Sequence, residues 1–146
     1  MDELLLMLKL SSQGFHCSQI LLSMGLEAQG KQNTDLVRCM EGLAGGVGFC
    51  GDICGALTGG ACLLALYAGR GFSDEEEDPR LNLMIAELTE WFSQEFATCY
   101  GGIHCREILD EDPGNQTVRC PGIVTKTYEQ VKTLLLNNGF ELSESK

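Results

Sequence analysis

The sequence is short of basic residues. Among its 146 residues, ten Lys and Arg stand against twenty-one Asp and Glu, so the formal net charge is −11 at pH 7. A chain of this charge repels both the phosphate backbone of a nucleic acid and an anionic lipid surface. We therefore expect no nucleic-acid binding and no membrane association.

No uncharged apolar stretch of the sequence is long enough to cross a membrane. The stretch Ile53–Ala68 has 16 residues, whereas a transmembrane helix needs about 20, so we interpret it as a buried core helix. The N-terminus also lacks the features of a signal peptide. It starts with Asp2 and Glu3, its apolar stretch is broken at Lys9, and no small-residue cleavage site follows. These absences predict a cytoplasmic protein.

The sequence has eight cysteines but no CxxC pair. The spacing therefore matches neither a c-type haem attachment site nor a zinc finger or ribbon. Reducing thiol pools in the cytoplasm disfavour permanent disulfides. The cysteines thus indicate metal binding or reversible redox chemistry.

Apolar residues recur with the period of an α-helix, and the alternation typical of strands is absent. With 44% hydrophobic residues the chain can bury a core, and its length suits one domain over residues 1–146. We predict an all-α fold, a single-domain helical bundle of five to six helices with a central glycine-rich buried helix. Four of the expected helices cover residues 2–10, 34–43, 52–68 and 120–138, and a short helical turn is expected at 105–109. One further helix runs from residue 17 to either 24 or 29. Another begins at either 73 or 79 and ends at 99.

Glycines mark two unusual places in this pattern. The run from Gly42 to Gly51 contains five glycines, and because each costs a helix about 1 kcal/mol relative to alanine, we expect an irregular backbone there. Asp52 is then the expected N-cap of the central helix. Within that helix Gly55 and Gly59 lie on one side, which predicts that another backbone or a ligand approaches closely.

Four cysteines fall at predicted helix N-termini. Cys17 and Cys105 follow helix-breaking glycines, Cys54 follows the Asp52 cap, and Cys120 occupies a cap position because Pro121 suits the first helical residue. Free backbone N–H groups and the helix dipole stabilise a thiolate at such positions. We therefore select these four as the candidate cofactor-binding and metal-binding residues.

The remaining four cysteines lie elsewhere in the pattern. Cys39 and Cys62 fall on apolar helix faces, and Cys99 falls at a helix C-terminus, so we interpret all three as small hydrophobic residues. Cys50 precedes Cys54 by four residues and could share a metal with it if the central helix starts early. The two histidines each precede a cysteine, and we interpret them as surface or loop residues.

Several of these segments together resemble a known family. They are Phe15-His16-Cys17, Cys54-Gly55-Ala56-Leu57-Thr58-Gly59-Gly60, Gly101-Gly102-Ile103-His104-Cys105 and Cys120. The resemblance is to the C_GCAxxG_C_C family of putative redox-active proteins and runs from about Gly14 to Leu136. It implies four functional cysteines at Cys17, Cys54, Cys105 and Cys120. Some relatives join this domain to haem-binding segments, which points to electron transfer and an iron–sulfur centre.

The leading hypothesis is a small redox-active protein whose four cysteines converge on an iron–sulfur cluster for electron transfer, with [2Fe–2S] expected because four cysteines are its ordinary ligands. One alternative is a thiol–disulfide redox enzyme in which Cys54 attacks. Another is a structural zinc or interaction domain without redox turnover. The expected partner is a redox protein with a basic surface, and a homodimer is a further expected assembly.

Overall fold

The computed structural model describes residues 2–146, and every regular element in this range is helical. The all-α single domain predicted from the sequence is therefore confirmed. The elements are α1 (Glu3–Ser12), α2 (Cys17–Ala28), α3 (Thr34–Met40), η1 (Glu41–Leu43), α4 (Gly55–Ala68), α5 (Pro79–Phe92), the π-helical η2 (Ser93–Ala97), α6 (Thr98–Tyr100), α7 (Cys105–Leu109) and α8 (Asn115–Asn137). Because α5, η2 and α6 run on without a break and η1 extends α3, residues 2–146 form seven helical rods, slightly more than predicted.

Side-chain caps fix where three of these helices begin. The Asp2 carboxylate accepts hydrogen bonds from the backbone N–H groups of the first turn of α1. Asn33 caps α3 in the same way. Asp78 caps α5, whose first residue is Pro79, so the Asp-Pro start is correct and the rival start at Ser73 is not. These caps satisfy N–H groups that have no partner within the helix.

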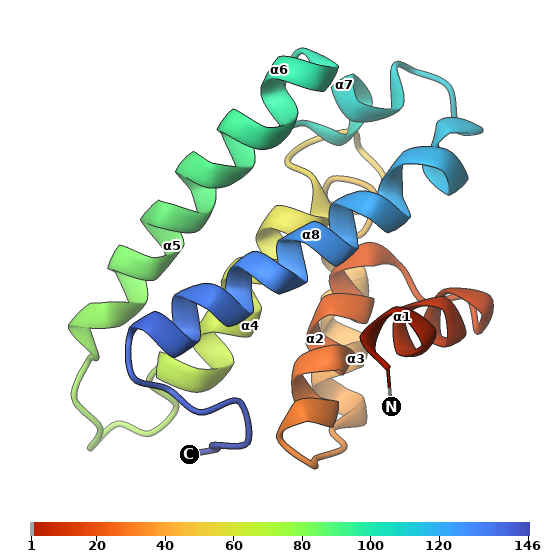
Figure 1. Ribbon diagram of the computed structural model, residues 1–146. Helices are drawn as coiled ribbons and strands as arrows, with labels where there is room; N and C mark the ends of the chain where they lie inside the picture. The colour runs from red at the N-terminus through yellow and green to blue at the C-terminus, as the bar shows by residue number, and fades with distance from the viewer. Residues whose placement is uncertain (1) are drawn as a thin grey trace.

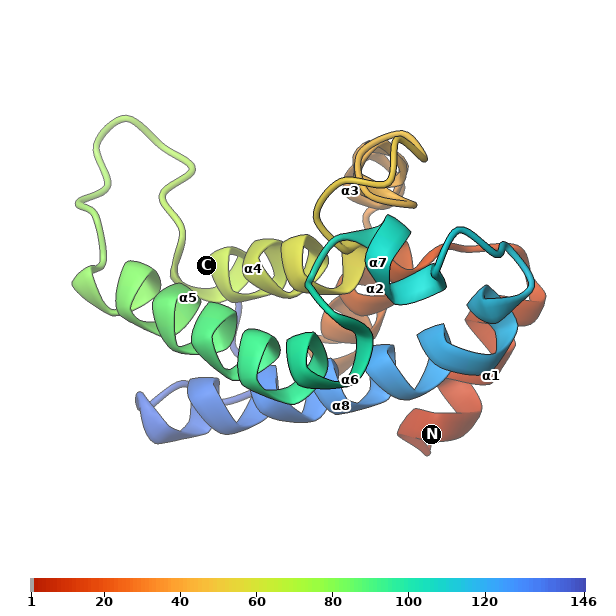
Figure 2. The same cartoon turned by 90° about the horizontal axis from the view of Figure 1, so that it is seen from above.

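The glycine-rich helix α4 lies at the centre of the fold. It packs against α2, α5 and α8, and Figures 1 and 2 show it enclosed between α2 on one side and the long rods of α5 and α8 on the other. Leu63, Leu64 and Tyr67 of α4 are buried in the main core. Among the helices that residues 2–146 form, none is both long and apolar enough to cross a membrane.

The central helix starts later than the sequence predicts. Asp52 is not its N-cap, because Cys54 occupies that position and α4 begins at Gly55. The Asp52 carboxylate instead accepts from the N–H of Ile53, its own neighbour. The backbone of this segment is extended and pairs with another part of the chain, and this pairing replaces the expected first turn.

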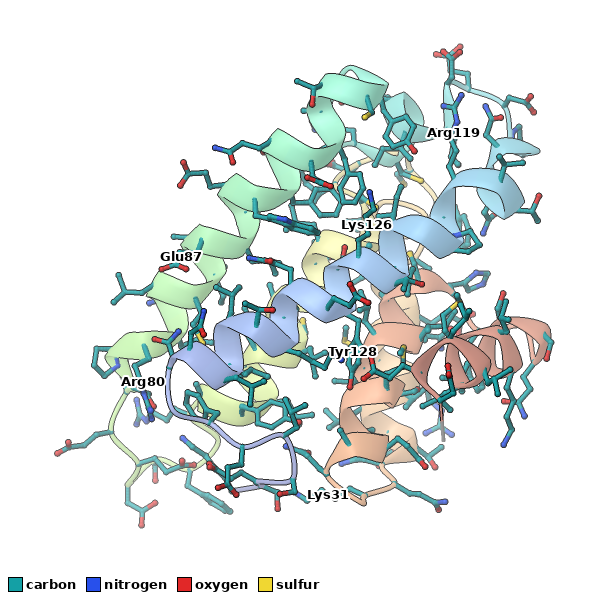
Figure 3. All side chains as sticks on the ribbon, viewed as in Figure 1. Lys31, Arg80, Glu87, Arg119, Lys126 and Tyr128 are labelled. Atoms are coloured by element: carbon teal, nitrogen blue, oxygen red, sulfur yellow. The ribbon has the colours of Figure 1, made fainter. Side chains whose placement is uncertain are left out.

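The last helix starts earlier than the sequence predicts. We expected it to open at Cys120 with Pro121 as the first helical residue, but α8 begins at Asn115 and Pro121 lies inside it. A proline inside a helix removes one backbone hydrogen bond. Two hydrogen bonds to α7 carbonyls stabilise the added turns, from Asn115 Nδ2 (2.8 Å) and from Arg119 Nη1 (2.6 Å). Figure 3 labels Arg119 at this end of α8.

The helical periodicity of the sequence predicts that Leu36, Cys39 and Trp91 lie in the core, but none of them is fully buried. Leu36 and Cys39 of α3 are exposed, and Trp91 is only half-buried. The reason is the position of α3, which packs against α2 and η1 but not against the central core. A one-sided contact buries only Met40 of this helix fully.

Candidate functional site

The structure brings the four selected cysteines together. Cys17, Cys54, Cys105 and Cys120 all line one cavity of about 350 Å³. They come from four separate elements: the first residue of α2, the N-cap of α4, the first residue of α7 and the second turn of α8. Residues that are about a hundred positions apart in the chain therefore share one site.

A single antiparallel bridge places two of these cysteines. It joins the extended segment before α4 to the segment before α7. The N–H of Cys54 donates to the Ile103 carbonyl (2.9 Å), and the N–H of Cys105 donates to the Asp52 carbonyl (2.7 Å). Because side chains alternate along an extended backbone, Cys54 and Cys105 project to the same side of the bridge. This is the side on which the cavity lies.

Cys17 is placed by contacts at the start of α2. The Gln19 side chain accepts from the backbone N–H of His16 (3.1 Å) and donates to the Val37 carbonyl (3.1 Å), which ties this start to α3. On the facing helix, a Cβ added at Gly55 would lie only 2.7 Å from Cys17 Sγ. Glycine at position 55 therefore leaves the room that the sulfur occupies.

The glycine run forms a tight loop at one side of the cavity. Gly45, Phe49 and Gly51 of this loop line the cavity. Val47 (φ 62°) and Phe49 (φ 61°) adopt the left-handed conformation that is rare for side chains of their size. Hydrogen bonds from the N–H of Gly51 to the Gly45 carbonyl and from Asp52 to Gly46 close the loop on itself. The irregular backbone predicted for this run is confirmed.

Burial raises the pKa of all four cavity thiols above its ordinary value, and desolvation is the largest cause for each. The pKa of Cys120 rises to about 12. Charge repulsion between neighbouring thiolates raises the pKa of Cys17, Cys54 and Cys120 further. Backbone N–H groups at the starts of α2 and α4 oppose the shift at Cys17 and Cys54 without outweighing it. The expectation that helix N-termini would favour thiolates here is therefore wrong for the metal-free chain.

The four thiols line one cavity, but they do not form a compact site for one ion. Across residues 2–146, no three His, Cys, Asp or Glu side chains are arranged to hold a single metal ion. Thiolates bound to one zinc ion would all lie about 2.3 Å from it. The four sulfurs instead surround a space whose other walls are largely apolar, with Phe49, Ile108 and Leu109 among them.

The other four cysteines do not line the cavity. Cys39, Cys50 and Cys99 are exposed, and Cys62 is half-buried beside the cluster of Leu22, Leu26 and Met40. The placement of Cys39 on a buried apolar face is therefore wrong, and that of Cys62 is partly right. Cys99, interpreted as a small hydrophobic residue, is exposed. All eight thiols are free.

Sequence reasoning missed several residues that line the cavity. His16 contacts Phe49 edge to face with ring centroids 5.0 Å apart, and both line the site together with Arg106 and Gln116. His104 does not line it; its Nδ1 lies 2.6 Å from a Glu107 carboxylate oxygen. Only the sequence proximity of His16 and Arg106 to cysteines could have pointed to them, and no sequence signal marks Gln116.

Comparison with known proteins adds one finding to this geometry. The family model described as "Putative redox-active protein (C_GCAxxG_C_C)" matches residues 15–134. This range includes most of the chain and all four cavity cysteines. Among curated proteins and among solved structures, none matches the chain.

Proposed function

Because the chain belongs to the C_GCAxxG_C_C family of putative redox-active proteins, we propose that it transfers electrons through an iron–sulfur cluster bound by Cys17, Cys54, Cys105 and Cys120. The observation that carries the proposal is that these four thiols line one cavity. Four cysteines are the ordinary ligand set of a [2Fe–2S] cluster, and such a cluster supplies one-electron redox chemistry when bound.

The donor set and the space around it fit this group. A two-iron cluster is larger than a single ion, which agrees with sulfurs that surround a cavity of about 350 Å³ but form no single-ion site within residues 2–146. The raised thiol pKa values also indicate that four thiolates do not coexist here unless positive charge lies among them. Iron provides that charge.

The rest of the lining has a separate role. Phe49, Ile108 and Leu109 surround the sulfurs with apolar side chains, and such walls exclude water and lower the local dielectric, which tunes a redox potential. Arg106, Glu111 and Asp112 also line the cavity and are exposed. We place the contact with a redox partner at this charged edge, and the strongly acidic chain favours a basic partner surface. Eight free thiols agree with a reducing compartment such as the cytoplasm.

The test is loading of the reduced full chain under anaerobic conditions. The purified protein is reconstituted with iron and sulfide, and visible absorbance, iron and acid-labile sulfide are measured. We expect bound iron and sulfide in equal amounts. Cys54→Ser and Cys120→Ser should each weaken iron binding by at least roughly 10–100-fold. Loss of a residue that only hydrogen-bonds to a metal ligand already has an effect of that size, and these two residues are proposed to bind the iron directly.

The chain contains its own control. Cys39→Ser and Cys99→Ser change exposed thiols outside the cavity and should leave iron and sulfide content unchanged. Zinc retained in preference to iron, without a visible chromophore, would instead support the structural alternative. The protein could instead bind neither metal and form disulfides between pairs of the four cavity cysteines on mild oxidation. This result would favour the thiol–disulfide alternative.

A further inference from the structure

The helix α1 has two apolar sides. One side is anchored in the fold, where Met7 is buried and Leu6 and Leu10 pack against the core. On the other side Leu4, Leu5 and Leu8 remain 51%, 60% and 49% exposed. Figures 1 and 2 show α1 at the edge of the molecule, next to α2 and away from α5. In the part of the chain that the structure describes, about half of this leucine face is therefore open to solvent.

A groove of about 530 Å³ lies beside this face, between α1, α2 and α3. Its apolar lining comes from all three helices and from the connection between the first two. The apolar residues are Leu6, Leu10, Phe15, Leu26 and Val37. The groove and the leucine face are therefore neighbours on the surface. Each presents apolar side chains that the other could cover.

The charges of the groove differ from those of the whole chain. Three of the ten Lys and Arg residues line it, Lys9, Lys31 and Arg38. Within residues 2–146, neither Lys9 nor Lys31 forms an ion pair. Figure 3 labels Lys31 at the turn that follows α2. Two carboxylates, Glu27 and Glu41, also line the groove. Three cations against two carboxylates leave it slightly positive in a strongly acidic chain, and it lies beside a helix whose first residues are acidic.

We propose that a second copy of this chain covers the surface, so that α1 of each copy lies against the groove of the other. A twofold arrangement of this kind uses one surface twice, because the surface is complementary to itself. The exposed leucines contact the apolar lining of the groove. The acidic end of α1 approaches Lys31. Glu3 is already paired with Lys132 of its own copy, so Asp2 is the carboxylate that faces the cations of the groove.

Charge favours a second copy of the chain over an anionic membrane as the occupant of this surface. Two chains of net charge −11 repel one another over most of their surface, and they approach with least repulsion where positive and negative groups are balanced. An anionic membrane is disfavoured because α1 carries Asp2 and Glu3 against the single cation Lys9 and the whole chain has a net charge of −11, whereas interfacial helices carry several Lys and Arg beside their apolar face. The groove must take part, since three leucines cannot bury the roughly 800 Å² per partner of a stable interface.

The test is sedimentation equilibrium of the reduced full chain over a range of concentrations. We expect a monomer–dimer equilibrium, which Leu5→Glu shifts toward monomer by at least about tenfold in dissociation constant, since it places a charge in an apolar contact. Lys31→Glu should act in the same direction. Leu83→Glu alters a leucine that is 64% exposed on α5 and should leave the equilibrium unchanged.

Circular dichroism of each variant establishes that the helices are retained. A monomer at every concentration would overturn the proposal, and so would a dimer that Leu5→Glu does not weaken. Co-sedimentation with vesicles of phosphatidylcholine and phosphatidylserine, if lost in Leu5→Glu, would assign the leucine face to lipid and would overturn it too. Iron loading is measured separately and should not change in these variants, so failure here is distinguishable from failure of the cluster proposal.

Discussion

At the scale of single residues, the eight cysteines differ by environment and not by sequence spacing. The four in the cavity come from four elements and are shielded to different degrees, from the buried Cys54 to the half-buried Cys105. The periodicity of α3 predicted a buried Cys39, but the pattern cannot show that this helix has a partner on one side only. Capping signals placed Cys17, Cys54 and Cys105 at helix starts, as the structure has them. Cys120 lies in the second turn of α8, so only the family motifs select it correctly.

Alkylation should therefore proceed in a definite order. In the reduced, metal-free chain, iodoacetamide should modify the exposed thiols Cys39, Cys50 and Cys99 first and Cys54 last, with at least about a tenfold difference in rate. The reason is that the thiolate is the reactive form and that burial both shields Cys54 and raises its pKa. Peptide mass spectrometry after timed quenching measures the order. Early modification of Cys54 would mean that the cavity opens readily in solution.

At the scale of elements, the glycines of α4 explain how closely the helices approach. A Cβ added at Gly59 would lie 2.9 Å from Cα of Ser18 in α2, a distance that only movement of the backbone could relieve. Sequence spacing indicated that a backbone or a ligand comes near this side of α4, and the backbone is that of α2. The starts of α4 and α8 could not be predicted in the same way, because an extended pairing and hydrogen bonds to α7 set them.

Two alanine substitutions should shift stability in opposite directions. Gly59→Ala forces α2 and α4 apart and should lower the free energy of unfolding by about 1–3 kcal/mol, as overpacking does. Gly122→Ala lies in α8, where an added Cβ meets nothing within 4 Å, and should raise it by about 0.5–1 kcal/mol through helix propensity. Urea unfolding of both variants and wild type measures the difference. Equal shifts would mean that the α2–α4 contact is looser than described.

At the scale of the whole molecule, the buried thiols link folding to pH. The pKa of each cavity thiol is raised in the folded, metal-free chain, chiefly by desolvation, whereas an unfolded thiol has a pKa of about 8.5. Below that value both states hold the proton and stability does not depend on these groups. Above it the unfolded chain loses protons that the folded chain keeps, so stability falls as pH rises.

The free energy of unfolding of the reduced apoprotein should therefore decline from about pH 8.5 upward, and a buried thiol such as Cys54 contributes at most about 1.4 kcal/mol per pH unit. Urea unfolding between about pH 7.5 and 9.5 measures this decline, below the range in which tyrosines titrate. Cys54→Ala should flatten the slope, whereas Cys99→Ala should not. A stability that is constant across the range would show that the cavity thiols are solvated.

The distribution of the cavity cysteines along the chain also affects how the protein is made. Cys17 leaves the ribosome about a hundred residues before Cys120, which corresponds to roughly 5–20 s at ordinary rates of synthesis. During that interval Cys39, Cys50 and Cys62 emerge in turn, and an early cysteine can pair wrongly with them. The cavity cannot be completed before Cys120 emerges. The cluster proposed for this cavity could not gain all four of its ligands before that point, and a nascent chain exposed to oxidant is at greater risk than the finished protein.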